Sequence, residues 1–124
     1  MSEVNKYVTS SDENGGVNIS QDVIAVIAGN AALEVDGVAS LHPVHSRDIA
    51  ELVGKKGFVR SVRTVIESDA VTIDIYIITE VGAKVGGVGA NVQKAVMEAV
   101  ENSVGTRPAA VNVHVSGISL KKSV

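Results

Sequence analysis

The clearest pattern along the chain is an alternation of apolar and polar positions over residues 71–79. Val71, Ile73, Ile75 and Ile77 are all apolar and β-branched, whereas most of the even positions between them are polar. This period of two predicts a strand that buries one face in a core.

After a glycine cluster, the spacing of apolar positions becomes that of a helix, and the expected inner positions are Val88, Val92, Ala95, Val96, Ala99 and Val100. Gly105 is expected to cap this helix in the left-handed conformation, which only glycine adopts without steric cost. We expect the glycines before the helix to form a strand-to-helix corner with close backbone approach, and they are Gly82, Gly86, Gly87 and Gly89.

An earlier helix is predicted from Ser20, a favourable N-cap residue, to about Asp36, with Gly37 as its stop. Its expected core stripe consists of Ile24, Ile27, Ala28, Ala31 and Val35.

The opposite side of this earlier helix is also apolar. Val26 and Leu33 lie there one heptad apart, beside the small residues Ala25, Gly29 and Ala32. A monomer would normally carry charge on such a face, so either another element of the domain covers it or it is a subunit interface. Val26, Leu33 and, from the second helix, Met97 are therefore the candidate self-association residues.

Three other segments have strand character. Residues 17–19 form a short apolar run, and residues 58–67 are expected to make a more exposed strand that pairs with residues 71–79 through a turn at 68–70. In the last segment Val111, Val113 and Val115 face inward. The β-α-β-β-α-β order predicts an α+β fold, a two-layer sandwich with both helices on one face of a small mixed sheet.

The composition favours one domain, over residues 17–118, between two polar tails. Residues 1–16 are expected to be a flexible tail and residues 119–124 a short C-terminal one. Residues 42–57 are expected to be an ordered connection with a short helix at 47–53. The chain shows neither a signal-peptide pattern nor the roughly 18 apolar residues of a membrane span, so membrane contact is expected to be peripheral.

The composition also narrows the chemistry. With 124 residues and no cysteine, the chain has no disulfide, thiolate ligand or cysteine nucleophile, which fits a reducing compartment. Tyr7, Phe58 and Tyr76 are the only aromatic residues, so base-stacking platforms are not expected. The net charge of −3 disfavours a phosphate-backbone partner.

The candidate catalytic and metal motifs are weak. His42 and His45 have a metal-like spacing, but they flank a proline and no third ligand is evident. Ser46 and Asp48 add the residue types of a catalytic triad without its geometry. We therefore expect no catalytic residues, no metal site, no cofactor and no small-molecule substrate.

An alternative class is a nucleic-acid module similar to KH domains. Gly86-Gly87-Val88-Gly89 matches the glycine loop of those domains, although here it follows a strand and its middle residues are uncharged. The contact residues in that reading would be Lys84, Gly86, Gly87, Gly89, Lys55, Lys56, Arg60 and Arg63.

Several blocks of sequence, in order, resemble the alkaline shock protein family of Gram-positive bacteria. They are Ile19-Ser20, Val23-Ile24, Ile27-Ala28, Ala31-Ala32 and residues 34–38, then residues 49–56, 71–77, Gly82, Val92-Gln93, Val96, Val100-Glu101 and 111–118. The resemblance covers residues 16–118. Family members commonly have an aromatic residue where this chain has Val81.

The resemblance implies a non-enzymatic stress protein that is abundant in the cytoplasm and self-associates. It also implies that an integral membrane protein holds the chain at the inner face of the membrane. No catalytic residues are carried over from the family.

Overall fold

The computed structural model describes residues 4–5, 7–42, 61–68 and 70–120. The connection expected after His42, with its short helix, lies outside these residues. The strands are β1 (Val4–Asn5), β2 (Tyr7–Asp12), β3 (Gly15–Ser20), β4 (Val38–Leu41), β5 (Val62–Glu67), β6 (Ala70–Glu80) and β7 (Ala110–Ser119), and the helices are α1 (Gln21–Leu33) and α4 (Val85–Val104).

Strand β6 is the centre of the main sheet because it pairs along both of its edges. One edge pairs antiparallel with β5 over residues 70–75 and with β4 over residues 77–79. The other edge pairs with β7 in the parallel direction. The two residues of β1 extend the sheet beyond β5.

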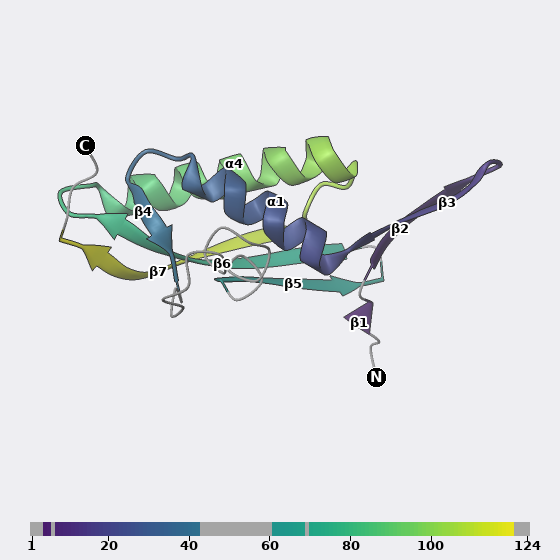
Figure 1. Ribbon diagram of the computed structural model, residues 1–124, viewed down its shortest axis with the longest axis horizontal. Coiled ribbons are helices and arrows are strands. Elements are labelled where there is room, and N and C mark those ends of the chain that lie inside the picture. The colour runs from purple at the N-terminus through teal and green to yellow at the C-terminus, as the bar shows by residue number, and fades with distance from the viewer. Residues whose placement is uncertain (1–3, 6, 43–60, 69, 121–124) are drawn as a thin grey trace, which may run out of the picture.

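The predicted alternation in β6 is confirmed. Val71, Ile73, Ile75 and Ile77 are each at most 2% exposed, whereas the side chains between them, on the other face of the sheet, are half-buried. Both helices pack against the buried face, α1 over β4 and β5 and α4 over β7 (Figure 1). The structure is therefore the predicted two-layer α+β sandwich with a mixed sheet.

Helix α1 begins where its N-cap predicts. The Val23 backbone N–H donates to the Ser20 hydroxyl oxygen at 3.2 Å. The helix ends at Leu33, earlier than the predicted end near Asp36, and Gly37 at φ +96° leads into β4. The pattern at residues 38–41 was too short for the sequence to predict this strand.

The expected core stripe of α1 is only partly correct. Ile24 and Ala28 are fully buried, but Ala25, Gly29 and Ala32, which were predicted to lie on the opposite side, are buried as well. The remaining predicted core positions, Ile27, Ala31 and Val35, are only partly buried. Helix α4 packs against α1, and small side chains on the shared side allow two helices to approach closely.

The expected tight corner at the glycine cluster is wrong. Helix α4 begins at Val85, so Gly86, Gly87 and Gly89 lie in its first turns, where an added Cβ would meet nothing within 4 Å. The turn before the helix uses only Gly82, at φ +88°. At the other end, the predicted left-handed cap is confirmed, because Gly105 has φ +85° and its N–H donates to the Glu101 carbonyl.

The N-terminal segment is not an unstructured tail as far as Gly16. Strands β2 and β3 form an antiparallel hairpin with regular pairing from Tyr7–Ser20 to Asp12–Gly15. The hairpin projects from the sandwich as a separate two-stranded sheet (Figure 1). The two turn residues are Glu13 and Asn14, and Gly15, at φ +122°, follows them as the partner of Asp12.

Strands β5 and β7 differ from expectation in opposite ways. β5 is less exposed than predicted, since Val62 and Ile66 are 3% and 2% exposed. In β7 the predicted inward position Val111 is 1% exposed, but Val115 is 37% exposed. The β6–β7 register shifts there, because Ile77 pairs with Val115 and Ile78 with Gly117, which leaves Ser116 as the extra residue of a bulge.

Gly37→Ala is expected to lower the free energy of unfolding by about 2 to 4 kcal/mol. The residue has a positive φ, and an added Cβ would lie 2.5 Å from Val88 Cγ2 on α4. Both strain and overpacking therefore oppose the methyl group. Urea denaturation of the variant and the wild type measures the difference.

Gly89→Ala is the matched control and is expected to raise the free energy of unfolding by about 0.5 to 1 kcal/mol. Gly89 is helical, and a Cβ there meets no atom within 4 Å. If both variants were equally destabilised, the contact between Gly37 and α4 would not be a constraint on the fold.

Candidate interaction surface

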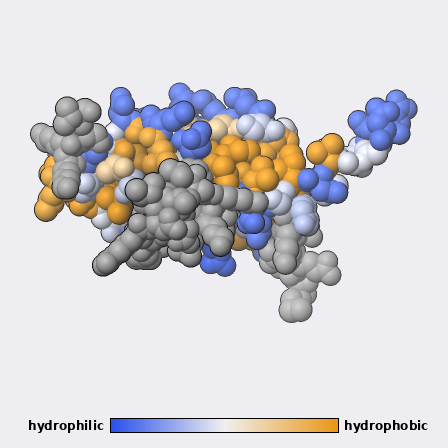
Figure 2. Space-filling model, in the orientation of Figure 1, coloured by the Kyte–Doolittle hydropathy of each residue, from blue (hydrophilic) through white to orange (hydrophobic). Residues whose placement is uncertain are grey.

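The outward side of α1 is an apolar surface that includes two exposed aliphatic side chains. We define the α1 face as Val23, Val26, Ile27, Asn30 and Leu33, which lie on one side of the helix. Val23 is 42% and Leu33 40% exposed, and Val26 and Ile27 are half-buried. Apolar atoms accordingly gather over α1 (Figure 2). Asn30 is the one polar residue of this face.

The structure keeps Val26 and Leu33 on one surface, as their heptad spacing predicts. The small residues expected beside them, Ala25, Gly29 and Ala32, lie in the core instead. The exposed neighbour that the sequence analysis missed is Val23, which occupies the first turn of the helix. Its signal was the apolar spacing of three residues between Val23 and Val26.

Met97 does not join this surface. It lies one turn from Gln93 on α4, and the Gln93 side-chain amide donates to the Val111 carbonyl oxygen of β7 at 2.9 Å. Met97 and Gln93 line a shallow depression of about 300 Å³ with Lys94 and Arg107. This flank of α4 faces β7, whereas α1 lies in the same helix layer over β4 and β5.

The alternative contact residues are not assembled into a glycine loop. In KH domains such a loop joins two helices, but here Gly86, Gly87 and Gly89 belong to α4 itself. Lys84 is the N-cap residue of α4, beyond the end of β6, while Arg63 pairs across the sheet with Asp74, well before that end. Lys55, Lys56 and Arg60 lie outside the described residues.

A small polar cluster lies on the sheet face opposite the helices. His114 Nε2 is 3.0 Å from Asp74 Oδ1, and the His114 ring stacks on Tyr76 with ring centroids 4.4 Å apart. These residues come from the parallel neighbours β6 and β7. Since Val113 and Val115 were predicted to face inward, the alternation puts His114 between them on the opposite face, but its pairing with Asp74 depends on a strand register that the sequence did not specify. The polar contact with Asp74 and the ring stack on Tyr76 therefore join β7 to β6 on this face of the sheet.

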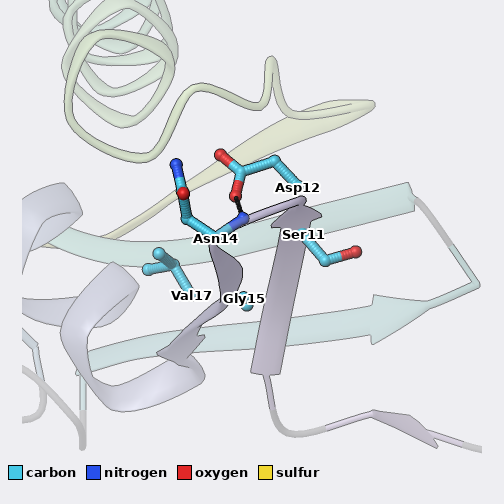
Figure 3. Close-up of a pocket in the computed structure, with 6 residues that line it drawn as sticks. Ser11, Asp12, Asn14, Gly15 and Val17 are labelled. Carbon is cyan, nitrogen blue, oxygen red and sulfur yellow. Dashed lines mark hydrogen bonds between the residues drawn. The ribbon is translucent and has the colours of Figure 1, made fainter.

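The turn of the β2–β3 hairpin encloses a small depression lined by Ser11, Asp12, Asn14, Gly15, Gly16 and Val17 (Figure 3). The Asn14 backbone N–H donates to Asp12 Oδ1 at 2.8 Å. This local bond is typical of an Asx turn, in which the carboxylate satisfies its own backbone. The Asp12 carboxylate therefore stabilises the turn, and the side chains that line this depression do not form a recognisable ligand site.

Of the candidate metal and catalytic residues, His42 alone lies within the part of the chain that the structure describes. His42 follows β4, and its backbone N–H donates to the Tyr76 carbonyl, whereas His45, Ser46 and Asp48 lie outside the described residues. Within 4–5, 7–42, 61–68 and 70–120, no three His, Cys, Asp or Glu residues are placed to hold a metal ion. The helices that the structure describes include none with the length and apolarity needed to cross a membrane.

The comparison with known proteins agrees with the sequence blocks. The model of the alkaline shock protein family, which is described by its "cell envelope-related function", matches residues 9–120. The uncharacterized protein YqhY of Bacillus subtilis (strain 168) is 35% identical over 104 residues, which are 84% of this chain and 77% of that protein. YloU of the same strain is 35% identical over 84% of this chain and 88% of its own length.

A streptococcal relative extends the match. The uncharacterized protein Spy1535 of Streptococcus pyogenes serotype M6 is 37% identical over 88% of this chain and 83% of that protein. No solved structure matches the chain significantly. The matched region includes the β2–β3 hairpin from Thr9 onward, both described helices and all of β7. The resemblance noted in the sequence is thereby confirmed, and the chain belongs to the alkaline shock protein family, whose function is related to the cell envelope.

Proposed function

We propose that this protein is a non-enzymatic scaffold of the cell envelope that self-associates through the α1 face and is held at the inner side of the membrane by an integral membrane partner. The observation that carries the proposal is the exposure of Val23 and Leu33 on the outward side of a helix whose inner side is already fully packed. Apolar side chains gathered in this way mark protein contact surfaces.

The energetics favour a modest but specific contact. Burying apolar surface contributes about 25 cal/mol per Å², so covering several half-exposed aliphatic side chains stabilises an assembly without their being needed for the monomer fold. The α1 face contains no charged residue, although the residues that flank it, Asp22 and Glu34, are acidic. An apolar centre with a charged rim is the usual composition of a protein interface.

The cell-envelope relation of the family supports the membrane side of the proposal. The integral membrane partner and the stress-response role both follow from the family resemblance. On the same resemblance we propose that the protein is cytoplasmic and takes no substrate, cofactor or nucleic-acid ligand.

Replacing both Val26 and Leu33 with glutamate is expected to abolish association through the α1 face. The two charges would have to be desolvated at a close, symmetric contact, which costs several kcal/mol for like charges. Sedimentation equilibrium measures the oligomeric state, and far-ultraviolet circular dichroism measures helix content, which is expected to stay at the wild-type value.

The single variant Leu33→Glu separates assembly from folding, because Leu33 is 40% exposed whereas Val26 is half-buried. Val17→Glu, at a 59% exposed position on the hairpin, is the matched control and should leave assembly unchanged. Unfolding of Leu33→Glu would show that the α1 face is part of the core and would refute the proposed contact.

Affinity purification of the tagged protein from separated membrane and soluble fractions of its source cells is expected to recover a small integral membrane protein. The Leu33→Glu variant is expected to recover fewer copies of the untagged chain. Recovery from the soluble fraction alone, with RNA that resists moderate salt, would contradict the envelope proposal, since electrostatic nucleic-acid contacts weaken steeply with salt.

A further inference from the structure

Strand β7 has the longest edge that no described strand covers. It pairs with β6 on one side, and the described chain places no strand on its other side. At the start of that strand the Val111 carbonyl accepts a hydrogen bond from Gln93 of α4. Further along, at residues 112–118, the backbone groups that point away from β6 face no described strand that pairs with them.

The composition of this edge does not protect it. Natural edge strands usually carry charged residues or proline, which discourage pairing with another chain. β7 has no lysine, arginine, aspartate, glutamate or proline over its whole length. By contrast, β5 carries Arg63 and Glu67, and the tip of the β2–β3 hairpin carries Asp12 and Glu13.

An apolar patch accompanies the open edge. The bulge at Ser116 changes the alternation, so that Ile118 pairs with Thr79 and lies on the helix side together with Val115. These two side chains are 56% and 37% exposed. Val85, at the start of α4, is also 37% exposed, and the hydrogen bond from Val81 N to Ser119 O places it at the same end of the molecule. Apolar atoms are visible at this end, where β7 finishes (Figure 2).

We infer that β7 pairs antiparallel with β7 of a second copy of this chain. A two-fold axis perpendicular to the sheet would join the two main sheets into one and keep both helix layers on the same face. The inference rests on the proposed self-association and assigns it a surface separate from the α1 face.

A second copy fits this edge because the edge is self-complementary. A two-fold contact places the same strand opposite itself, so an acidic or basic residue on β7 would approach its own copy, and the one titratable side chain, His114, is already beside Asp74. On the helix side, Val115 of each copy would lie close to the axis, and Ile118 would lie farther out, opposite the first part of the partner's strand. The bulge interrupts regular pairing at Ser116, so the axis is expected among residues 112–115, between the bulge and the Gln93 contact at Val111.

The chain contains no cysteine, so single cysteines introduced into it report on single positions. Opposed residues of antiparallel strands have Cα atoms about 4.5 to 5.5 Å apart, which is within the range of about 4.4 to 6.8 Å for a disulfide. A cysteine close to the two-fold axis can therefore bond to its own copy. Mild oxidation of the variants Asn112→Cys, Val113→Cys, His114→Cys and Val115→Cys is expected to give a maximum of dimer at one or two neighbouring positions and less on either side.

Val17→Cys is the control for random collision, because it is 59% exposed and lies in the β2–β3 hairpin, a sheet separate from that of β7. Leu33→Cys reports on the α1 face. A cross-linked dimer at Leu33 with only the control level along β7 would overturn the edge pairing while leaving proposed self-association intact. A monomer at all concentrations, with only control-level cross-linking everywhere, would refute both.

Lysines at Val115 and Ile118 provide a test without oxidation. Both side chains are already exposed in the single chain, so the double variant Val115→Lys/Ile118→Lys is expected to fold, with an unchanged circular dichroism spectrum. The dissociation constant of the dimer is expected to rise by at least about tenfold, because the Val115 lysines of the two copies would approach each other near the axis and the Ile118 lysines would add positive charge along the outer part of the contact. Unchanged association of this folded double variant would overturn the inference.

Discussion

The structure depends on the pairing of β6 along both edges while every second side chain of the strand is buried. The pairing register of β6 and the choice of its buried face determine each other, because shifting the strand by one residue would move Ile73, Ile75 and Ile77 out of the core. Once β6 is placed, β5 and β4 share one edge, β7 takes the other, and the helices can cover only the face that carries the isoleucines. The open face keeps the polar positions, among them Asp74.

The valines of α4 complete the core on the same principle. Val88, Val92, Val96 and Val100 recur every fourth residue and are at most 7% exposed, so one narrow line of the helix meets the sheet. β-branched side chains have few χ1 choices in a helix, which makes such a line well defined in shape. Small residues of α1 then fill the remaining space, and Gly37 passes so close to Val88 that no side chain fits there.

Local patterns were enough to predict β6, the N-cap at Ser20, the C-cap at Gly105 and the two-layer fold. These patterns failed where packing against another element determines which residues are buried. The rotation of α1 toward Ala25, Gly29 and Ala32 depends on the approach of α4, and hydrophobicity alone favoured the larger residues. The glycines at the start of α4 predicted a strand-to-helix corner from their sequence alone, although their backbone is helical. For the candidate surface, Val26 and Leu33 followed from periodicity, but separating Met97 from them required the three-dimensional position of Gln93.

The parallel arrangement of β6 and β7 also has a consequence for the order of folding. β5 and β6 are neighbours in the chain and need only a short connection to pair, whereas the parallel pairing of β7 with β6 requires the crossover through α4 that lies between them in the sequence. Until β7 pairs, the second edge of β6, apolar on its inner face, is without its strand. Unpaired strand edges that are exposed during folding promote misassociation, so this edge of β6 depends on β7 for its protection.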